Sequence, residues 1–171
     1  MSVITFSKHF QSNHPKKGEP TFFVEKIWKG LWDMSSLKGK SPYLAEYQQN
    51  HDNHFGIDQV VNVHRFEPKW HTIRAGKRFK VGDCFDPRVW SGKPYNSPQI
   101  QIAPAIEVKK TWEFEMDARG FYWINGYNAG FDIEEVAKND GLTIDDFNFW
   151  FHGSKGFEGQ IICWNENIEY V

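Results

Sequence analysis

Apolar residues recur at helical spacing in the first third of the chain and at shorter, strand-like spacing in the rest. One face of the helical pattern is formed by Val24, Ile27, Trp28 and Leu31. This spacing predicts a helix from Thr21 to Asp33, with Pro20 suited to its first turn. A second short helix is expected in the segment SPYLAEYQQN, with Ser41 as its N-cap and Pro42 at the first helical position.

Short apolar runs from Val60 onward predict that the remainder of the chain is mainly β-structure. The expected strands cover residues 59–65, 70–73, 99–103, 107–116, 121–124 and 159–164, after an opening strand in ITFSKHF. In the longest of them one face is shared by Val108, Lys110, Trp112, Phe114 and Met116, which is typical of a strand covered on one side. The IICW run is expected to be a central strand, and residues 76–98, which contain several Gly and Pro turns, are expected to be a long irregular connection.

Two short helices are expected between these strands, one from Asp132 to Lys138 and one from Thr143 to Phe151. Thr143 and Asp146 have the spacing of a capping box, which fixes the start of the second helix. Short strands with small helices between them indicate an α+β fold. We expect a partly open β-barrel with the N-terminal helices packed outside it.

Composition adds a functional expectation to this pattern. Aromatic residues make up 17% of the 171 residues, more than a core of this size needs, so we expect some rings to face a ligand. No run approaches the roughly 20 apolar residues that cross a bilayer, and the N-terminus lacks a signal-peptide pattern. We therefore expect a cytoplasmic protein without membrane contact, with Cys84 and Cys163 as small buried thiols rather than a disulfide.

Charge is segregated along the chain although its net value is only −2. The segment from Pro68 to Gly82 holds five Lys or Arg residues and no acid, whereas Asp132 to Asp146 holds six acids and one Lys. The basic segment is therefore expected to be a local binding surface for an anionic partner.

The basic segment also carries aromatic residues, which gives it a binding chemistry. On a strand, Trp70, Thr72 and Arg74 point to one side, and Lys69, His71 and Ile73 point to the other. An aromatic face stacks on a base and a cation neutralises phosphate, as single-stranded nucleic acid requires. The nucleic-acid-binding candidates are Trp70, His71, Arg74, Lys77, Arg78, Arg88, Trp90, Lys93 and Tyr95, the last four lining a rim. The alternative is a solvated loop with Trp70 half-buried and the cations merely exposed.

Three motifs in this half resemble the ASCH domain, a PUA-like β-barrel tied to RNA metabolism. They are Lys69-x-x-Thr72-x-Arg74 followed by Gly82-Asp83, then Ala137-x-x-Asp140-Gly141, then Phe147-x-x-Trp150-Phe151. Glu67 stands where the family signature usually has Gly. The resemblance implies that residues 59–171 form the ASCH domain and residues 1–58 a helical extension packed on it.

The same resemblance implies candidate catalytic residues. Some small ASCH proteins are amidohydrolases that remove the acetyl group from N4-acetylcytidine with a Lys, a Thr three residues later and an acid. Lys69, Thr72 and Asp140 take these places, with Asp140 where the enzymes carry Glu. In such a set the Lys activates the Thr hydroxyl, and the acid protonates the leaving amine. Resemblance to ASCH proteins with ribonuclease activity also exists.

Three hypotheses for the function follow. The first is a module that binds RNA or a modified base, with DNA and a free nucleoside left open as ligands. The second is a hydrolase that uses the same residues, and the third is a protein-interaction adaptor that works through the N-terminal helices. We expect no cofactor and no metal, since His51 and His54 have no thiol or carboxylate at a characteristic spacing. The oligomeric state is not fixed by the sequence.

Overall fold

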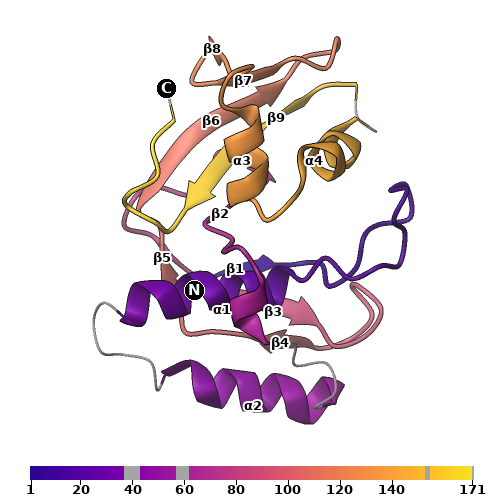
Figure 1. The fold of residues 1–171 in the computed structure, drawn as a ribbon, viewed down its shortest axis with the longest axis vertical. Coiled ribbons are helices and arrows are strands. Elements are labelled where there is room, and N and C mark those ends of the chain that lie inside the picture. The colour runs from indigo at the N-terminus through magenta and orange to yellow at the C-terminus, as the bar shows by residue number, and fades with distance from the viewer. Residues whose placement is uncertain (37–42, 57–61, 153–154, 171) are drawn as a thin grey trace. The chain divides into compact units, whose positions relative to one another are not determined.

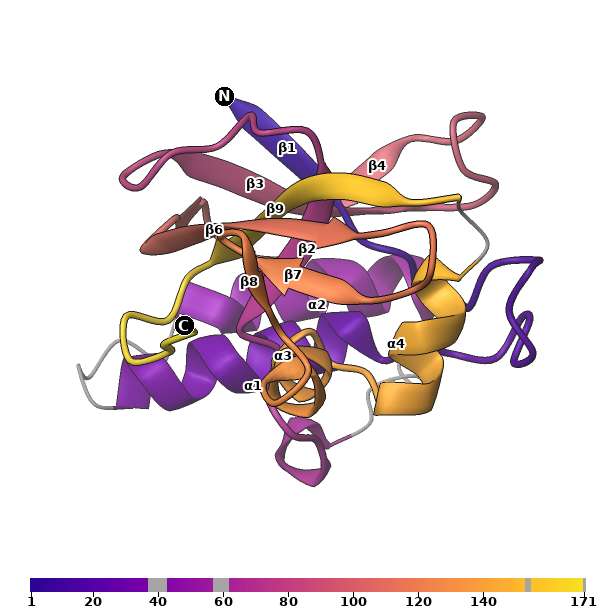
Figure 2. The same cartoon turned by 90° about the horizontal axis from the view of Figure 1, so that it is seen from above.

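The computed structural model describes residues 1–36, 43–56, 62–152 and 155–170. In this part of the chain, four α-helices and two mostly antiparallel sheets confirm the predicted α+β class (Figures 1 and 2). Neither sheet closes into a barrel. No helix among these residues is both long enough and apolar enough to span a membrane.

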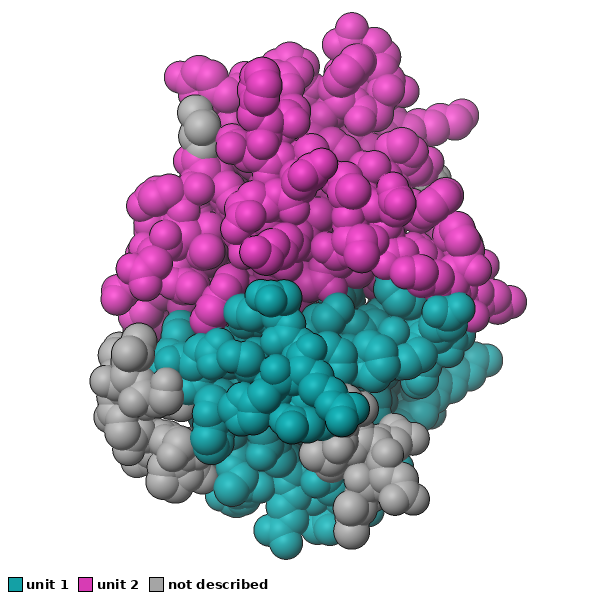
Figure 3. Space-filling model, in the orientation of Figure 1, with its two compact units in different colours: residues 1–10, 18–68, 84–106 teal, residues 11–17, 69–83, 107–171 magenta. Residues whose placement is uncertain are grey.

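The chain divides into two compact units, which Figure 3 distinguishes by colour. Unit 1 comprises Met1–Phe10, Gly18–Pro68 and Cys84–Ile106, and unit 2 comprises Gln11–Lys17, Lys69–Asp83 and Glu107–Val171. Both units are therefore built from segments that are distant in sequence. The predicted domain boundary between residues 58 and 59 lies outside the described residues, as do Ser41 and Pro42.

Unit 1 combines a small sheet with two helices. Its strands are β1 (Ser2–Thr5), β3 (Cys84–Trp90) and β4 (Gln99–Gln101), and β5 (Ile106–Glu107) also pairs with β3. β1 runs parallel to β3, whereas β4 is antiparallel to it. The helices are α1 (Phe23–Ser36) and α2 (Tyr43–Phe55), followed by a 3-10 helix at Val63–Arg65.

Helix α1 is held by its predicted apolar face. Val24, Ile27 and Trp28 are buried, and the Trp28 indole donates to the carbonyl of Ile102 at 2.7 Å. The helix begins at Phe23 rather than at Thr21, because the Thr21 hydroxyl accepts from the Phe23 N–H at 3.3 Å. Pro20 was wrongly placed in the first turn, since it forms a β-bridge with His9 instead.

Unit 2 contains a five-stranded antiparallel sheet. In spatial order its strands are β2 (His71–Ala75), β9 (Phe157–Cys163), β6 (Lys110–Met116), β7 (Tyr122–Ile124) and β8 (Tyr127–Asn128). Because β9 pairs with both β2 and β6, the prediction of a central strand in IICW is confirmed. Helices α3 (Ile133–Asn139) and α4 (Ile144–Phe151) lie on one face of this sheet (Figures 1 and 2).

The core of unit 2 is aromatic. Phe114 on β6 is fully buried, and its ring centroid lies 5.5 Å from that of Phe151 and 6.0 Å from that of Phe147. Glu113 and Glu115 on the same strand are exposed, which confirms the predicted alternation. The predicted cap of α4 is confirmed as well, because the Thr143 hydroxyl accepts from the Asp146 N–H at 3.1 Å.

Several local predictions were wrong. Residues 84–90, expected to be an irregular connection, form strand β3, because Phe85 and Val89 are buried despite the neighbouring Gly and Pro residues. Residues 63–65, expected to be part of a strand, form a 3-10 helix. Cys163 is buried as predicted, but Cys84 is exposed at the start of β3.

Candidate functional site

An ion pair between Lys69 and Asp140 lies at the centre of the candidate site in unit 2. The Lys69 ammonium donates to the Asp140 carboxylate oxygen Oδ1 at 2.6 Å and also to the Asp140 backbone carbonyl. Asp140 is the C-cap of α3, which ends where Gly141 adopts a φ of +81°. The Trp70 N–H donates to the carbonyl of Asn139 at 2.8 Å, so the chain entering β2 is fixed to the end of α3.

A chain of polar side chains begins beside this ion pair. His71 is fully buried, with Nδ1 3.7 Å from the Oδ1 atom of Asp140, longer than a hydrogen bond. Its other nitrogen, Nε2, lies 2.9 Å from the Tyr170 hydroxyl. The Asn139 amide donates to the same hydroxyl at 2.8 Å. Five side chains thus form one polar network inside unit 2.

The partners fix the direction of the protons along this network. A phenol that accepts from Asn139 has its own proton to donate, and His71 Nε2 is the acceptor within reach. The neutral imidazole therefore carries its proton on Nδ1, directed toward Asp140. Asp140 faces a cation on one side and an N–H dipole on the other.

Burial and charge act in opposite directions on the ionisable groups. Burial alone would raise the pKa of Asp140, but the Lys69 ammonium and then His71 outweigh it and hold the pKa below its usual range. Burial lowers the pKa of His71 and raises that of Tyr170. At neutral pH the network therefore contains a carboxylate, a neutral imidazole and a protonated phenol.

The Asp140 carboxylate is the part of the ion pair that is offered to a ligand. The Asp140 side chain keeps 9% of its surface exposed, compared with 2% for Lys69 and none for His71. Within the described ranges, no residue donates a hydrogen bond to the second carboxylate oxygen of Asp140, Oδ2. A carboxylate in this state accepts hydrogen bonds, so Oδ2 can bind an N–H or O–H group of a small molecule.

The other predicted residues of unit 2 lie on β2 or just after it. Thr72 is buried on β2 opposite Ile162, Arg74 is half-buried opposite Gln160, and Trp70 is half-buried before the strand. Lys77 and Arg78 are exposed after β2, where the Lys77 ammonium pairs with Glu113 at 2.7 Å. The basic segment is thus partly neutralised by an acid of β6.

The four predicted rim residues belong to unit 1. Arg88 and Trp90 lie on β3, and the Arg88 guanidinium is 3.2 Å from the carboxylate of Asp86. Lys93 and Tyr95 are exposed in the connection from β3 to β4, where the rings of Tyr95 and Trp90 are 5.3 Å apart. The structure therefore places these four residues around one hairpin and Lys69 to Arg78 in the other unit.

Two members of the network were missed from the sequence. Neither Asn139 nor Tyr170 was among the predicted site residues. Asn139 was detectable only as the neighbour of Asp140, and nothing in the local sequence around Tyr170 marks it. No cluster of three or more His, Cys, Asp and Glu side chains within the described ranges could hold a metal ion.

Replacing Asp140 by Asn should destabilise the protein by about 3–5 kcal/mol, because it leaves the buried Lys69 ammonium without a counter-ion. Urea unfolding measures this change. The matched control is Asp145→Asn, which alters an exposed acid in the first turn of α4 and should change the free energy of unfolding by less than about 1 kcal/mol. Equal effects of the two changes would contradict the importance of the ion pair.

The buried His71 should make stability fall as the pH drops below 6.5, its unperturbed pKa. The folded state takes up this proton only at lower pH than the unfolded state does, so the stability is lost between the two pKa values. The slope is at most about 1.4 kcal/mol per pH unit for one such group. Unfolding at about pH 7.5 and about pH 5.5 should show a smaller loss for His71→Gln than for the unaltered protein. An equal loss in both proteins would rule out His71 as a source.

No model of a known protein family, no curated protein and no solved structure matches this chain. The resemblance to ASCH domains thus rests on the sequence motifs and stays a prediction. A proposal for the function therefore has to start from the observed arrangement of Asp140 and its neighbours.

Proposed function

We propose that unit 2 binds a nucleobase that carries an exocyclic amino group, either as a nucleoside or within RNA. The observation that carries this proposal is the state of Asp140: its carboxyl pKa is held low, Lys69 holds Oδ1, and a small part of the side chain reaches solvent. Such a group is a fixed hydrogen-bond acceptor at the end of a buried network. Its natural partner is a donor that also carries some positive potential.

The amino group of cytosine fits this acceptor. A carboxylate accepts from the N4 amino group of cytosine, whereas uracil has a carbonyl oxygen at the same position. Two acceptors would then face each other, and a site with a buried polar group left unpaired rejects the ligand strongly. We therefore expect a preference for cytosine over uracil.

Trp70, the residue after Lys69, is a second feature that supports base binding. Its backbone is fixed to Asn139, its side chain is half-buried, and its ring contacts no other aromatic ring of the described ranges. A ring of this kind can stack on a base, which contributes about 1–3 kcal/mol. The resemblance to ASCH domains, which includes the PUA-like fold, favours the same class of ligand.

The hairpin of unit 1 favours a nucleic-acid strand over a free nucleoside. Tyr95 is 88% exposed, beside Trp90 and the exposed Lys93. Residues 87–106 contain no Asp or Glu, so this surface does not repel phosphate. An exposed ring on a non-acidic hairpin is suited to stacking with an unpaired base.

Hydrolysis of an acylated nucleoside is the second candidate. Lys69 contacts Asp140, and Thr72 is buried three residues after Lys69, as the resemblance to amidohydrolases requires. However, two hydrogen bonds from the Lys69 ammonium go to Asp140, out of three N–H donors. This arrangement favours the charged ammonium over a free amine that could act as a base, so we place binding first.

Calorimetric titration should show that cytidine binds more tightly than uridine, by about ten- to a hundredfold, because one hydrogen bond to a charged group is lost. Asp140→Asn should remove most of this preference, since the new amide offers both a donor and an acceptor. Asp145→Asn should retain it. If Asp140→Asn does not fold, equal affinity of the unaltered protein for the two nucleosides still overturns the proposal.

Incubation with N4-acetylcytidine should leave it intact, because Lys69 is committed to Asp140. Liquid chromatography detects any cytidine that is released. Cytidine formed by the unaltered protein and not by Lys69→Ala would replace the binding proposal by the hydrolytic one.

A further inference from the structure

A second lysine, Lys8, lies in an environment very different from that of Lys69. It follows β1 in unit 1, and its ammonium nitrogen is 3.2 Å from Nε2 of His51 on α2. The same nitrogen lies 3.3 Å from the centre of the Phe55 ring. The Trp28 ring contacts His51 edge-on at 5.1 Å, and His51 is 1% exposed. The ammonium group of Lys8 thus lies among aromatic rings.

Lys8 has no carboxylate partner among the described residues. No Asp or Glu oxygen of these residues lies within 4.0 Å of its ammonium nitrogen, whereas Lys69 has Asp140 at 2.6 Å. The carboxyl group that acts on Lys8 electrostatically is Glu25 on α1, which is itself buried. A half-buried lysine without a counter-ion loses hydration, which favours the neutral amine, and the contacts with His51 and the Phe55 ring offset part of this loss.

His51 is arranged to take a proton from this amine. An N–H of Lys8 points to Nε2, so the neutral imidazole carries its proton on Nδ1, which lies 3.5 Å from the Asp52 carboxylate. The order amine, imidazole, carboxylate is the arrangement by which a base activates a nucleophile and an acid orients the base.

Burial and the neighbouring charges shift the pKa values of the ionisable groups in this arrangement. Burial lowers the pKa of Lys8, and the charge of Glu25 offsets only part of this effect. Burial and the Lys8 charge also lower the pKa of His51, Asp52 opposes them, and His54 adds a small lowering effect. Burial raises the pKa of Glu25 despite its neighbours Lys8 and Lys26. Each group is thereby moved toward its neutral form.

We propose that Lys8 is a nucleophilic amine that takes a small aldehyde as an imine. His51 accepts one proton of the Lys8 ammonium, and the amine electron pair forms a bond to the carbonyl carbon. The carbonyl π electrons move to oxygen, which takes one of the two protons left on nitrogen. The proton held by His51 then goes to this hydroxyl group, which leaves as water, and the nitrogen electron pair forms the C=N bond of a protonated imine. No oxidant or reductant is consumed, and the site lies in unit 1, independent of the function proposed for unit 2.

The aromatic surroundings define which aldehydes suit the site. Phe55 lies against the amine, and the Trp28 ring contacts His51, so the reacting group enters a largely aromatic environment. The site is also accessible, because Lys8 is intermediate in exposure and can be reached from solvent. A small uncharged aldehyde such as acetaldehyde fits these conditions better than an anionic one, since the carboxyl group that acts on Lys8 is Glu25.

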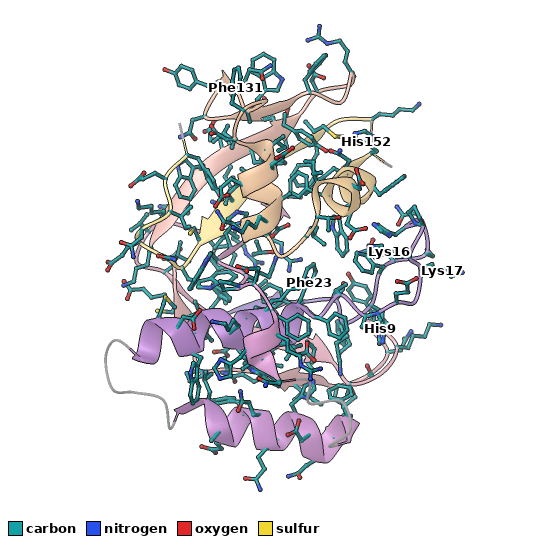
Figure 4. All side chains as sticks on the ribbon, in the orientation of Figure 1. His9, Lys16, Lys17, Phe23, Phe131 and His152 are labelled. Carbon is teal, nitrogen blue, oxygen red and sulfur yellow. The ribbon has the colours of Figure 1, made fainter. Side chains whose placement is uncertain are left out.

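The test is reductive alkylation of the full chain at neutral pH with limiting acetaldehyde and cyanoborohydride. Peptide mass spectrometry then locates the ethyl groups. Lys8 should be modified faster than the exposed Lys17, which is labelled in Figure 4, and Lys80, because a lowered pKa raises the fraction of neutral amine. Modification of Lys8 at the same rate as these lysines, or more slowly, would overturn the proposal.

Two variants separate the proposed chemistry from simple exposure. His51→Gln keeps a hydrogen-bond acceptor but no base, so it should slow the reaction of Lys8 and leave that of Lys17 unchanged. Glu25→Gln removes a charge that stabilises the ammonium and should speed the reaction of Lys8. If His51→Gln fails to fold by circular dichroism, Glu25→Gln and the unaltered protein still decide, since a slower Lys8 in Glu25→Gln contradicts the assignment.

Discussion

Burial of the Lys69 ammonium is the constraint on which unit 2 depends. A cation that is 1% exposed is tolerated only if a carboxylate and further acceptors replace the water it has lost. Asp140 supplies both a carboxylate oxygen and a backbone carbonyl. These contacts determine where α3 ends, and the hydrogen bond from Trp70 to Asn139 fixes the start of β2 to the same point. The ion pair therefore sets the relation between a helix end and a strand of the five-stranded sheet.

The remainder of the network follows from the same constraint. Burial disfavours the charged form of a carboxylate, so a second polar group near Oδ1 of Asp140, in addition to the lysine, helps to keep this carboxylate ionised. His71 provides that group, but a buried imidazole then needs a partner for its other nitrogen, which Tyr170 supplies. Asn139 completes the sequence of donors. Tyr170 and Asn139 thus each supply a hydrogen-bond partner to the side chain before them in the network.

The sequence predicted local elements better than contacts between residues that are distant in the chain. Local patterns identified α1, α4 with its Thr143 cap, the alternation of β6 and the central position of β9. They failed at β3, where Gly and Pro residues near Phe85 indicated a loop and pairing with β1 and β4 overrode that preference. Lys69 and Asp140 are 71 residues apart in the chain, and only the family resemblance of the motif spacing assigned them to one site. Tyr170 had no such pattern, since its role depends on a contact that no local rule describes.

The network also affects the order in which the protein can fold during its synthesis. His71 and Tyr170 are 99 residues apart in the chain, yet their side chains share one hydrogen bond. During synthesis from the N-terminus, Lys69, His71 and the strand that carries them leave the ribosome long before residue 170 does. Until then, β2 lacks its partner β9, and the imidazole lacks the phenol. Long-range contacts of this kind slow folding and leave strand edges open meanwhile. The sheet and the polar network of unit 2 can therefore be completed only after β9 and Tyr170 have been synthesised.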